Sequence, residues 1–370
     1  MQYIPILMGK KGELKALNEL DDKIRQGIKP LIQIPPIPKK WDTLSGEPEP
    51  DRSIDRHVNG IAESIANAWG LEHPIILDGL FIEDEDNLEN DIEAFAFILK
   101  EASDLGLQVI PAVGLDRYVE YVESVADAVK RDGHGLCLRL QPNDLENQAD
   151  LHVLVDSILK EIAINKSEVD LVLDYGTIDE NMESLLRVAV PAHIAALPGT
   201  SEWRSITFCS SSFPKDLSKV SRNDLSESDR TEWMVWNWLR TRGKLVRIPD
   251  FGDYAIQCPD ITELDPRLIR MSPNIRYTAE MVWLLAKGEA YKKKKDKKKS
   301  VPADVQYPIL CELIMNHQHW CGENFSFGDG FIARSSRKED GPGSATTWRA
   351  VGTNHHLTFV AQQLANLRAS

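Results

Sequence analysis

Eight short apolar runs rich in β-branched residues recur along this sequence, and a longer amphipathic stretch follows each of the first seven. This alternation is typical of parallel strands joined by helical crossovers. The expected strands are 3–7, 30–34, 74–77, 108–112, 135–140, 170–173, 205–208 and a last one near 254–257. The expected helices are 12–26, 54–69, 88–105, 117–131, 148–165, 179–190 and 228–241, with Asp179 and Ser228 as N-caps.

A ring of eight strands needs an eighth helix, and residues 354–367 supply it after a long excursion. We therefore predict an α/β fold, a (β/α)8 TIM-type barrel formed by 1–257 and 354–370. Residues 258–353 are predicted to be an inserted lid with an extended pair at 275–278 and 281–285 and a helix at 305–317. A doubly wound open sheet has the same local pattern, but the count of eight favours the barrel.

Charge and cysteine content indicate which partners and which cellular compartment to expect for this chain. The formal net charge of −14 repels a phosphate backbone, so nucleic acid is not the expected partner except through the lysine-rich loop 292–299. The N-terminus lacks the pattern of a signal peptide, and no apolar run is long enough to span a membrane. Five scattered cysteines suit a reducing compartment, so a cytoplasmic protein is expected.

Polar residues stand where several predicted strands end. In a parallel barrel these ends meet at the mouth, where side chains are free to act on a ligand. Asp78, Asp174 and Asp253 are the candidate catalytic carboxylates, although an Asp in this position often only caps the next helix. The other mouth candidates, proposed as ligand-binding or phosphate-binding, are Lys10, Glu13, Arg139, Ser210, Ser211, Ser212, Arg230 and Tyr254.

The serine triplet 210–212 follows the seventh strand, the position where barrels commonly bind phosphate through backbone N–H groups and hydroxyls. A mouth with carboxylates, an arginine and hydroxyls suits a phosphate-containing ligand, and Mg²⁺ could bridge carboxylate and phosphate. No Walker loop, GxSxG elbow or GxGxxG motif accompanies the triplet. An inert barrel with a polar rim is the alternative interpretation.

A second cluster consists of His317, His319 and Cys321, with Cys311 nearby in the sequence. His and Cys side chains are ligands for zinc. The spacing matches no standard zinc finger, and Gly322 indicates that the preceding helix ends here. Packing is therefore favoured over metal binding.

Several short motifs, in this order along nearly the whole chain, resemble the phage "beta protein" family. They are Tyr3-Ile4-Pro5-Ile6, Lys10-Lys11-Gly12-Glu13, Pro30-Leu31-Ile32, Ser211-Ser212-Phe213-Pro214, Arg230 with Glu232-Trp233, Gly252-Asp253-Tyr254, Arg276-Tyr277-Thr278 and Asn354-His355-His356. The motifs add Arg276, Tyr277 and His355 to the ligand-binding candidates, as a lid or wall of the mouth. Gln33 is a departure, because a glutamate is expected there.

The resemblance implies a setting in phages, satellites and prophages, in cassettes associated with phage exclusion or toxin control. A cassette neighbour protein is then the expected partner, bound directly or through a ligand at the mouth. The alternative is a barrel enzyme, a hydrolase or lyase, acting on a phosphate-containing or nucleotide-like substrate, which requires Asp78, Asp174 and Asp253 to converge. We expect Ser211 and Asp253 to lie solvated at the rim, and Ile76 and Val172 to lie in the strand interiors.

Overall fold

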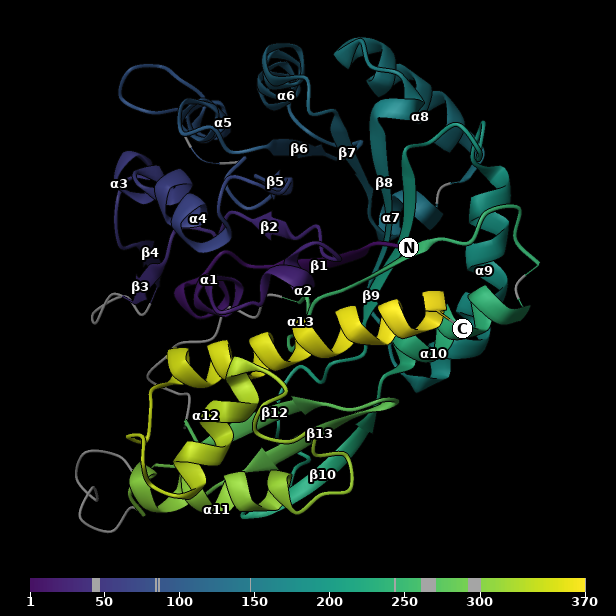
Figure 1. The fold of residues 1–370 in the computed structure, drawn as a ribbon. Coiled ribbons are helices and arrows are strands. Elements are labelled where there is room, and N and C mark those ends of the chain that lie inside the picture. Colours follow the sequence, from purple (N-terminus) through teal and green to yellow (C-terminus); the bar gives the residue numbers. More distant parts are fainter. Residues whose placement is uncertain are drawn as a thin grey trace.

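A closed barrel of parallel strands lies at the centre of the molecule, as the computed structural model shows (Figure 1). The structure describes all residues except 42–46, 84, 86, 147, 243, 261–270, 292–300 and 370, so the lysine-rich loop 292–299 lies outside the described residues. Around the barrel the strands follow the order β1, β11, β9, β8, β7, β6, β5, β2. Their bounds are β1 Tyr3–Leu7, β2 Leu31–Gln33, β5 Ile75–Asp78, β6 Val109–Val113, β7 Leu136–Leu140, β8 Val169–Thr177, β9 Ser205–Ser211 and β11 Asp250–Asp253.

Side chains alternate between the barrel interior and the layer beneath the helices, because successive residues of a strand point to opposite faces. On β1, Ile4 and Ile6 join the interior cluster, whereas Tyr3 and Leu7 join the large outer cluster. The interior cluster consists of Ile4, Ile6, Leu31, Ile76, Ile110, Ala112, Cys137, Val172, Cys209 and Tyr254. At the N-terminal end of the barrel, the Asp170 carboxylate bridges Lys29 Nζ at 2.8 Å and Arg204 Nη2 at 2.9 Å. The expected interior positions of Ile76 and Val172 are confirmed.

Amphipathic helices cover the barrel, as their sequences require. On α6 (Val119–Asp132) the buried residues Tyr121, Val122, Val125 and Ala128 share one face, and Gly133 ends the helix in the left-handed conformation with φ 67°. The other helices of this layer are α1 Lys11–Asn18, α2 Asp22–Arg25, α3 Ile54–Val58, α4 Ile61–Trp69, α5 Ala94–Asp104, α7 Pro142–Glu146, α8 Gln148–Ile162, α9 Glu183–Ala196, α10 Thr231–Arg242 and α13 Ala345–Ala369.

A second, smaller layer packs on the outside of the barrel beneath α13 (Figure 1). It is an antiparallel sheet of β10 Asp224–Asp229, β13 Val282–Lys287 and β12 Asn274–Thr278, covered by α11 Ala303–Met315 and α12 Phe327–Ser336. Its core contains Ile275, Leu284, Leu310 and Ile314, and α13 closes it with Trp348 and Val351. A short hairpin, β3 Lys39–Trp41 with β4 Pro48–Pro50, follows β2.

Three sequence-based expectations for the elements are wrong. The eighth strand is β11, Asp250–Asp253, rather than 254–257, because a strand containing Gly252 and two aspartates has the composition of a loop. Gly252 is required there, since a Cβ would lie 2.8 Å from the carbonyl oxygen of Ile4. Ser228 is not an N-cap but part of β10, whose polar sequence pairs with β13 through the backbone. Helix α13 begins at Ala345 rather than at 354. Among the described residues, no helix is long and apolar enough to cross a membrane.

Candidate functional site

Arg139 on β7 joins the inward-facing polar residues at the C-terminal end of the barrel. Its Nη1 donates to Asp78 Oδ2 at 2.6 Å, and its Nη2 donates to Asp174 Oδ2 and to the Tyr254 hydroxyl, each at 2.7 Å. All four side chains are buried. Burial alone would lower the pKa of Arg139, but Tyr254, Asp174 and Asp78 raise it well above its ordinary value. Asp78 and Asp174 therefore meet as expected, but on a guanidinium rather than around an open position for a cation such as Mg²⁺.

Gln33 lies beside this cluster, because it is in register with Asp78 on the neighbouring strand. It is buried, with 2% of its surface exposed. A glutamate here, as the family resemblance leads one to expect, would add a third carboxylate next to Asp78 and Asp174. Glutamine leaves the two carboxylates balanced by Arg139 and, more distantly, by Arg117, whose Nη2 lies 3.9 Å from Asp78 Oδ1.

Asp253 is the third candidate carboxylate, and it does not reach this cluster. The next residue, Tyr254, belongs to the interior cluster, so the Asp253 side chain points outward to α13. It accepts hydrogen bonds from the Tyr3 hydroxyl at 2.6 Å and from His356 Nε2 at 3.0 Å. Although burial alone would raise it, the pKa of Asp253 is lowered because His356 and Tyr3 stabilise the carboxylate. The expected convergence of three carboxylates is therefore wrong.

The solvated rim position expected for Ser211 and Asp253 is also wrong, because each is only 1% exposed. The Ser211 hydroxyl donates to the carbonyl of Gln257 at 3.0 Å and accepts from the backbone N–H of Phe213 at 3.2 Å. Ser210 is fully buried, and its Oγ has no hydrogen-bond partner in the described part of the chain. The Ser211 hydroxyl therefore supports the loop after β9 from within.

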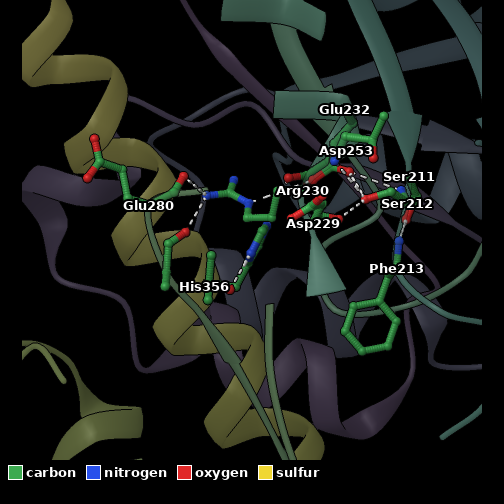
Figure 2. A network of polar contacts seen from close by, with 12 residues as sticks. Ser211, Ser212, Phe213, Asp229, Arg230, Glu232, Asp253, Glu280 and His356 are labelled. Carbon is green, nitrogen blue, oxygen red and sulfur yellow. Dashed lines mark hydrogen bonds and ion pairs between the residues drawn. The ribbon is translucent and has the colours of Figure 1, made fainter. Parts of the chain in front are cut away.

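Ser212 connects the same loop to the start of α10 (Figure 2). The carboxylate of Glu232 accepts from the Ser212 backbone N–H at 3.0 Å and from its hydroxyl. The hydroxyl oxygen in turn accepts from the backbone N–H of Thr231 at 3.1 Å. Ser212 therefore caps the first turn of α10, as polar residues that follow a strand often do.

Arg230 lies fully buried at the centre of Figure 2, between the rings of Trp233 and Trp283, each 5.3 Å from its guanidinium carbon. Its Nη1 donates to the carbonyl of Ala279 at 2.9 Å and to Gln363 Oε1 at 3.1 Å. Burial lowers the pKa of Arg230, and burial raises the pKa of Glu232, whose Oε1 lies 3.7 Å from Arg230 Nε. Among the described residues, Arg230 Nε and Nη2 have no hydrogen-bond partner.

Two arginines stand side by side on the rim of the mouth. Arg276 on β12 and Arg349 on α13 both donate to the carbonyl of Ile256, at 2.9 and 3.3 Å, and Arg276 lies 5.1 Å above the ring of Phe213. Burial and the neighbouring charge of Arg349 lower the pKa of Arg276 to about 9, and Glu13 only partly opposes this. In the described ranges neither guanidinium forms an ion pair with a carboxylate.

Lys10 and Glu13 complete this rim. Lys10 is exposed and is the N-cap residue of α1. Glu13 is buried, and burial raises its pKa against the opposing charge of Arg349. Arg349 is the member that sequence reasoning missed, because it lies within a helix rather than after a strand. Its only sequence signal is a basic residue in a helix whose neighbours Trp348, Ala350 and Val351 are apolar.

Tyr277 and His355 lie behind this rim in the core of the second layer. The Asp329 carboxylate accepts from the Tyr277 hydroxyl and from His355 Nδ1, each at 2.8 Å. His355 Nε2 lies 2.8 Å from the carbonyl oxygen of Thr278. Both ring nitrogens of His355 face acceptors, and both His355 and Asp329 are fully buried. This network joins α12, α13 and β12 and does not reach the mouth.

The His317, His319 and Cys321 cluster makes contacts within the protein. His317 Nε2 lies 3.1 Å from Glu227 Oε1, and the Cys321 thiol donates to the carbonyl of His319 at 3.7 Å. Cys311 is buried in the core of the second layer. Within the described part of the chain, no group of three or more His, Cys, Asp or Glu side chains could hold a metal ion.

Comparisons with known structures give matches of low identity. A triosephosphate isomerase from Bartonella henselae is 12% identical, with 68% of this chain and 92% of that chain covered and a TM-score of 0.35. A type I 3-dehydroquinate dehydratase from Clostridium difficile is 12% identical, with 70% and 87% covered and a TM-score of 0.38. A glycoside hydrolase family 5 protein from Bacteroides vulgatus is 13% identical, with 69% and 58% covered and a TM-score of 0.35.

Comparison with curated proteins gives no match. Comparison with protein families gives a match that spans nearly the whole barrel and the second layer. Residues 3–362 match the family described as Beta protein, in agreement with the order of motifs from β1 to α13. This chain belongs to the Beta protein family.

Proposed function

We propose that this chain binds a phosphate-containing anion at the rim formed by Arg276, Arg349 and Lys10. The observation that carries the proposal is that Arg276 and Arg349 share one carbonyl acceptor and that neither forms an ion pair with a described carboxylate. Burial, and after it the neighbouring charge of Arg349, lowers the pKa of Arg276, because like charges held this close repel each other. A bound anion would relieve the repulsion and give each guanidinium the bidentate acceptor that phosphate offers.

The surroundings of the two arginines support an anion rather than a cation. The ring of Phe213 covers one face of the Arg276 guanidinium, so part of its charge is shielded from water. Exposed Lys10 adds a further positive charge next to Glu13, whose pKa is raised by burial although the charges of Arg349 and Lys10 oppose this. The overall net charge is −14, which makes this local excess of positive charge unusual for the chain.

Binding is favoured over turnover by the inner cluster. Asp78 and Asp174 are buried and engaged by Arg139 and Tyr254, so neither is open to a substrate in this arrangement. The enzyme alternative requires Asp253 beside them, and Asp253 faces α13 instead. We therefore infer a ligand-sensing role in an anti-phage defence or toxin-control cassette, with a cassette neighbour as partner. The support for this setting is the resemblance of the chain's motifs to the phage beta protein family.

Isothermal titration calorimetry with inorganic phosphate and pyrophosphate tests the anion site. Wild type should bind, and Arg276→Ala and Arg349→Ala should each lose affinity by about 10- to 100-fold, the loss of one hydrogen bond between charged groups. The matched control is Arg337→Ala, an exposed arginine paired with Glu323 and Glu339 elsewhere on the surface. Absence of binding to wild type, or equal binding by all four proteins, would refute the proposal.

A phage-challenge assay of the complete cassette tests the biological role. Arg276→Ala should abolish protection while the protein stays folded, as judged by its thermal melt. Co-purification of a cassette neighbour in the presence and absence of phosphate tests the partner. Full protection by Arg276→Ala would separate the anion site from the defence role.

A further inference from the structure

A groove of about 510 Å³ runs along the outer wall of the barrel. Helices α10 and α13 form its two sides, and the turn between β12 and β13 closes one end with Glu280 and Met281. Its volume falls in the range of about 300–1,000 Å³ that is usual for small-molecule sites. The lining residues combine three aromatic rings, Trp233, Phe325 and Phe359, with four carboxamides, Asn237, Gln362, Gln363 and Asn366.

The second layer creates this groove. Helix α13 packs closely along α1, and the β12–β13 turn is fastened between α13 and α10. The backbone N–H of Arg230 donates to the carbonyl of Met281 at 2.9 Å, and Gln363 Nε2 donates to the carbonyl of Glu280 at 3.1 Å. The turn therefore holds α10 and α13 at a fixed separation, and the groove is preformed.

One face of α13 supplies an aromatic ring and three carboxamides to the groove. Phe359, Gln362, Gln363 and Asn366 are spaced so that they lie on the same side of the helix. The side chains of Gln362 and Asn366 make no hydrogen bond with any residue that the structure describes. Gln362 is half-buried and Asn366 is exposed, so this face of α13 borders solvent and both amides can pair with a ligand.

The third amide is held in place from below. Gln363 Oε1 accepts from Arg230 Nη1 at 3.1 Å, and Arg230 is fully buried behind it. Arg230 Nε and Nη2 have no partner among the described residues, so this arginine is left with hydrogen-bonding capacity directly beneath the groove. The groove floor is thus polar and fixed, while Trp233 offers an apolar surface beside it.

We propose that this groove binds a nucleobase, as the free base or a nucleoside. A heterocyclic base carries donors and acceptors side by side on one edge, and carboxamides pair with such edges through both of their groups. Aromatic side chains offer stacking surfaces that every base can use. The groove has one basic and one acidic residue, Arg240 and Glu280, so its charge is balanced and suits a neutral ligand rather than a phosphate.

The groove is a separate site from the anion rim and does not depend on it. Arg349 lies fourteen residues before Gln363 on α13, which is about 21 Å at the helical rise. A single mononucleotide would not span both sites. Failure of one proposal therefore leaves the other intact.

Saturation-transfer NMR and calorimetry with adenosine, guanosine, cytidine and uridine test this site. At least one nucleoside should bind wild type, and the double variant Gln362→Met/Asn366→Leu, which removes both unpaired amides at similar volume, should weaken it at least about tenfold. Phe359→Ala should weaken binding through the loss of stacking. Arg337→Ala, at the exposed arginine that pairs with Glu323 and Glu339 outside the groove, is the control and should bind the nucleoside as wild type does.

Three results would overturn the proposal. The first is that no nucleoside binds wild type at millimolar concentration. The second is that the double variant binds a nucleoside as well as wild type does. The third is that glucose or maltose binds in the groove and loses affinity on Gln362→Met while nucleosides do not bind, because aromatic rings and amides also recognise sugars. The variants lie at exposed or half-buried positions, so thermal melts should show them folded.

Discussion

The carboxylate of Asp253 illustrates how one residue can join strand and helix. It accepts from Tyr3 on β1 and from His356 on α13, while the other ring nitrogen of His356 meets the Thr278 hydroxyl on β12 at 2.8 Å. Burial lowers the pKa of His356, although the charge of Asp253 and its hydrogen bond oppose this. Three elements thus depend on one buried anion.

Asp253→Asn should therefore destabilise the protein strongly. The amide nitrogen of asparagine must face a donor, either Tyr3 or His356, and breaking such a buried charged network costs roughly 3–5 kcal/mol. Urea unfolding measures the change. Asp116→Asn is the control, because this side chain is 73% exposed and its loss should stay within about 0.5 kcal/mol. Equal stability of the two variants would show that Asp253 is not a structural residue.

Phosphate affinity should depend on alkaline pH through Arg276. The bound anion needs the protonated guanidinium, and the pKa of Arg276 is lowered to about 9. Phosphate affinity should therefore be at its maximum at neutral pH and should fall as the pH rises through about 9. Arg349→Ala should move this fall to higher pH, because Arg349 lowers the pKa of Arg276. Calorimetry between about pH 7 and 10 measures both curves. A pH-independent affinity would exclude Arg276 as a ligand.

At the level of elements, sequence periodicity was sufficient for the barrel strands and insufficient for the edges of the fold. Apolar runs identify strands that bury both faces, whereas β10 is polar and forms only because β13 offers it a partner. The expectation that polar residues at the ends of parallel strands meet at the mouth is correct for Asp78, Arg139 and Asp174. It misplaces Asp253 because a shift of one residue along a strand reverses the side to which a side chain points. Arg349 escaped because nothing local distinguishes a mid-helix arginine from a surface one.

The contact between α1 and α13 sets the position of Arg349, and Gly12 makes it close. A Cβ at Gly12 would lie 2.8 Å from Arg349 Cγ and 3.0 Å from the Thr346 carbonyl oxygen. Gly12→Ala should push the helices apart, cost about 1–3 kcal/mol and weaken phosphate binding. Gly341→Ala, where a Cβ meets nothing within 4 Å, is the control for both measurements. Unchanged phosphate affinity in Gly12→Ala would mean that Arg349 can move without loss of the site.

At the scale of the whole molecule, α13 belongs to both hydrophobic cores. Leu357, Val360 and Leu364 pack in the cluster around the barrel, and Trp348 and Val351 pack in the cluster of the second layer. The chain also enters the second layer at β10 and returns to the barrel at α10 before the rest of the layer is formed. Neither part can therefore lose its structure without exposing apolar surface of the other.

We expect the barrel and the second layer to unfold in one cooperative transition for this reason. Ile76→Ala in the barrel interior and Ile314→Ala in the second layer should each move the same calorimetric peak to lower temperature. Each substitution leaves a cavity that lowers the free energy of unfolding by roughly 2–5 kcal/mol. The van't Hoff and calorimetric enthalpies should agree in wild type and in both variants. Val188→Ala, at a side chain 72% exposed on α9, is the control and should leave the peak in place. If Ile314→Ala splits the peak into two, the second layer melts by itself, and α13 does not couple it to the barrel.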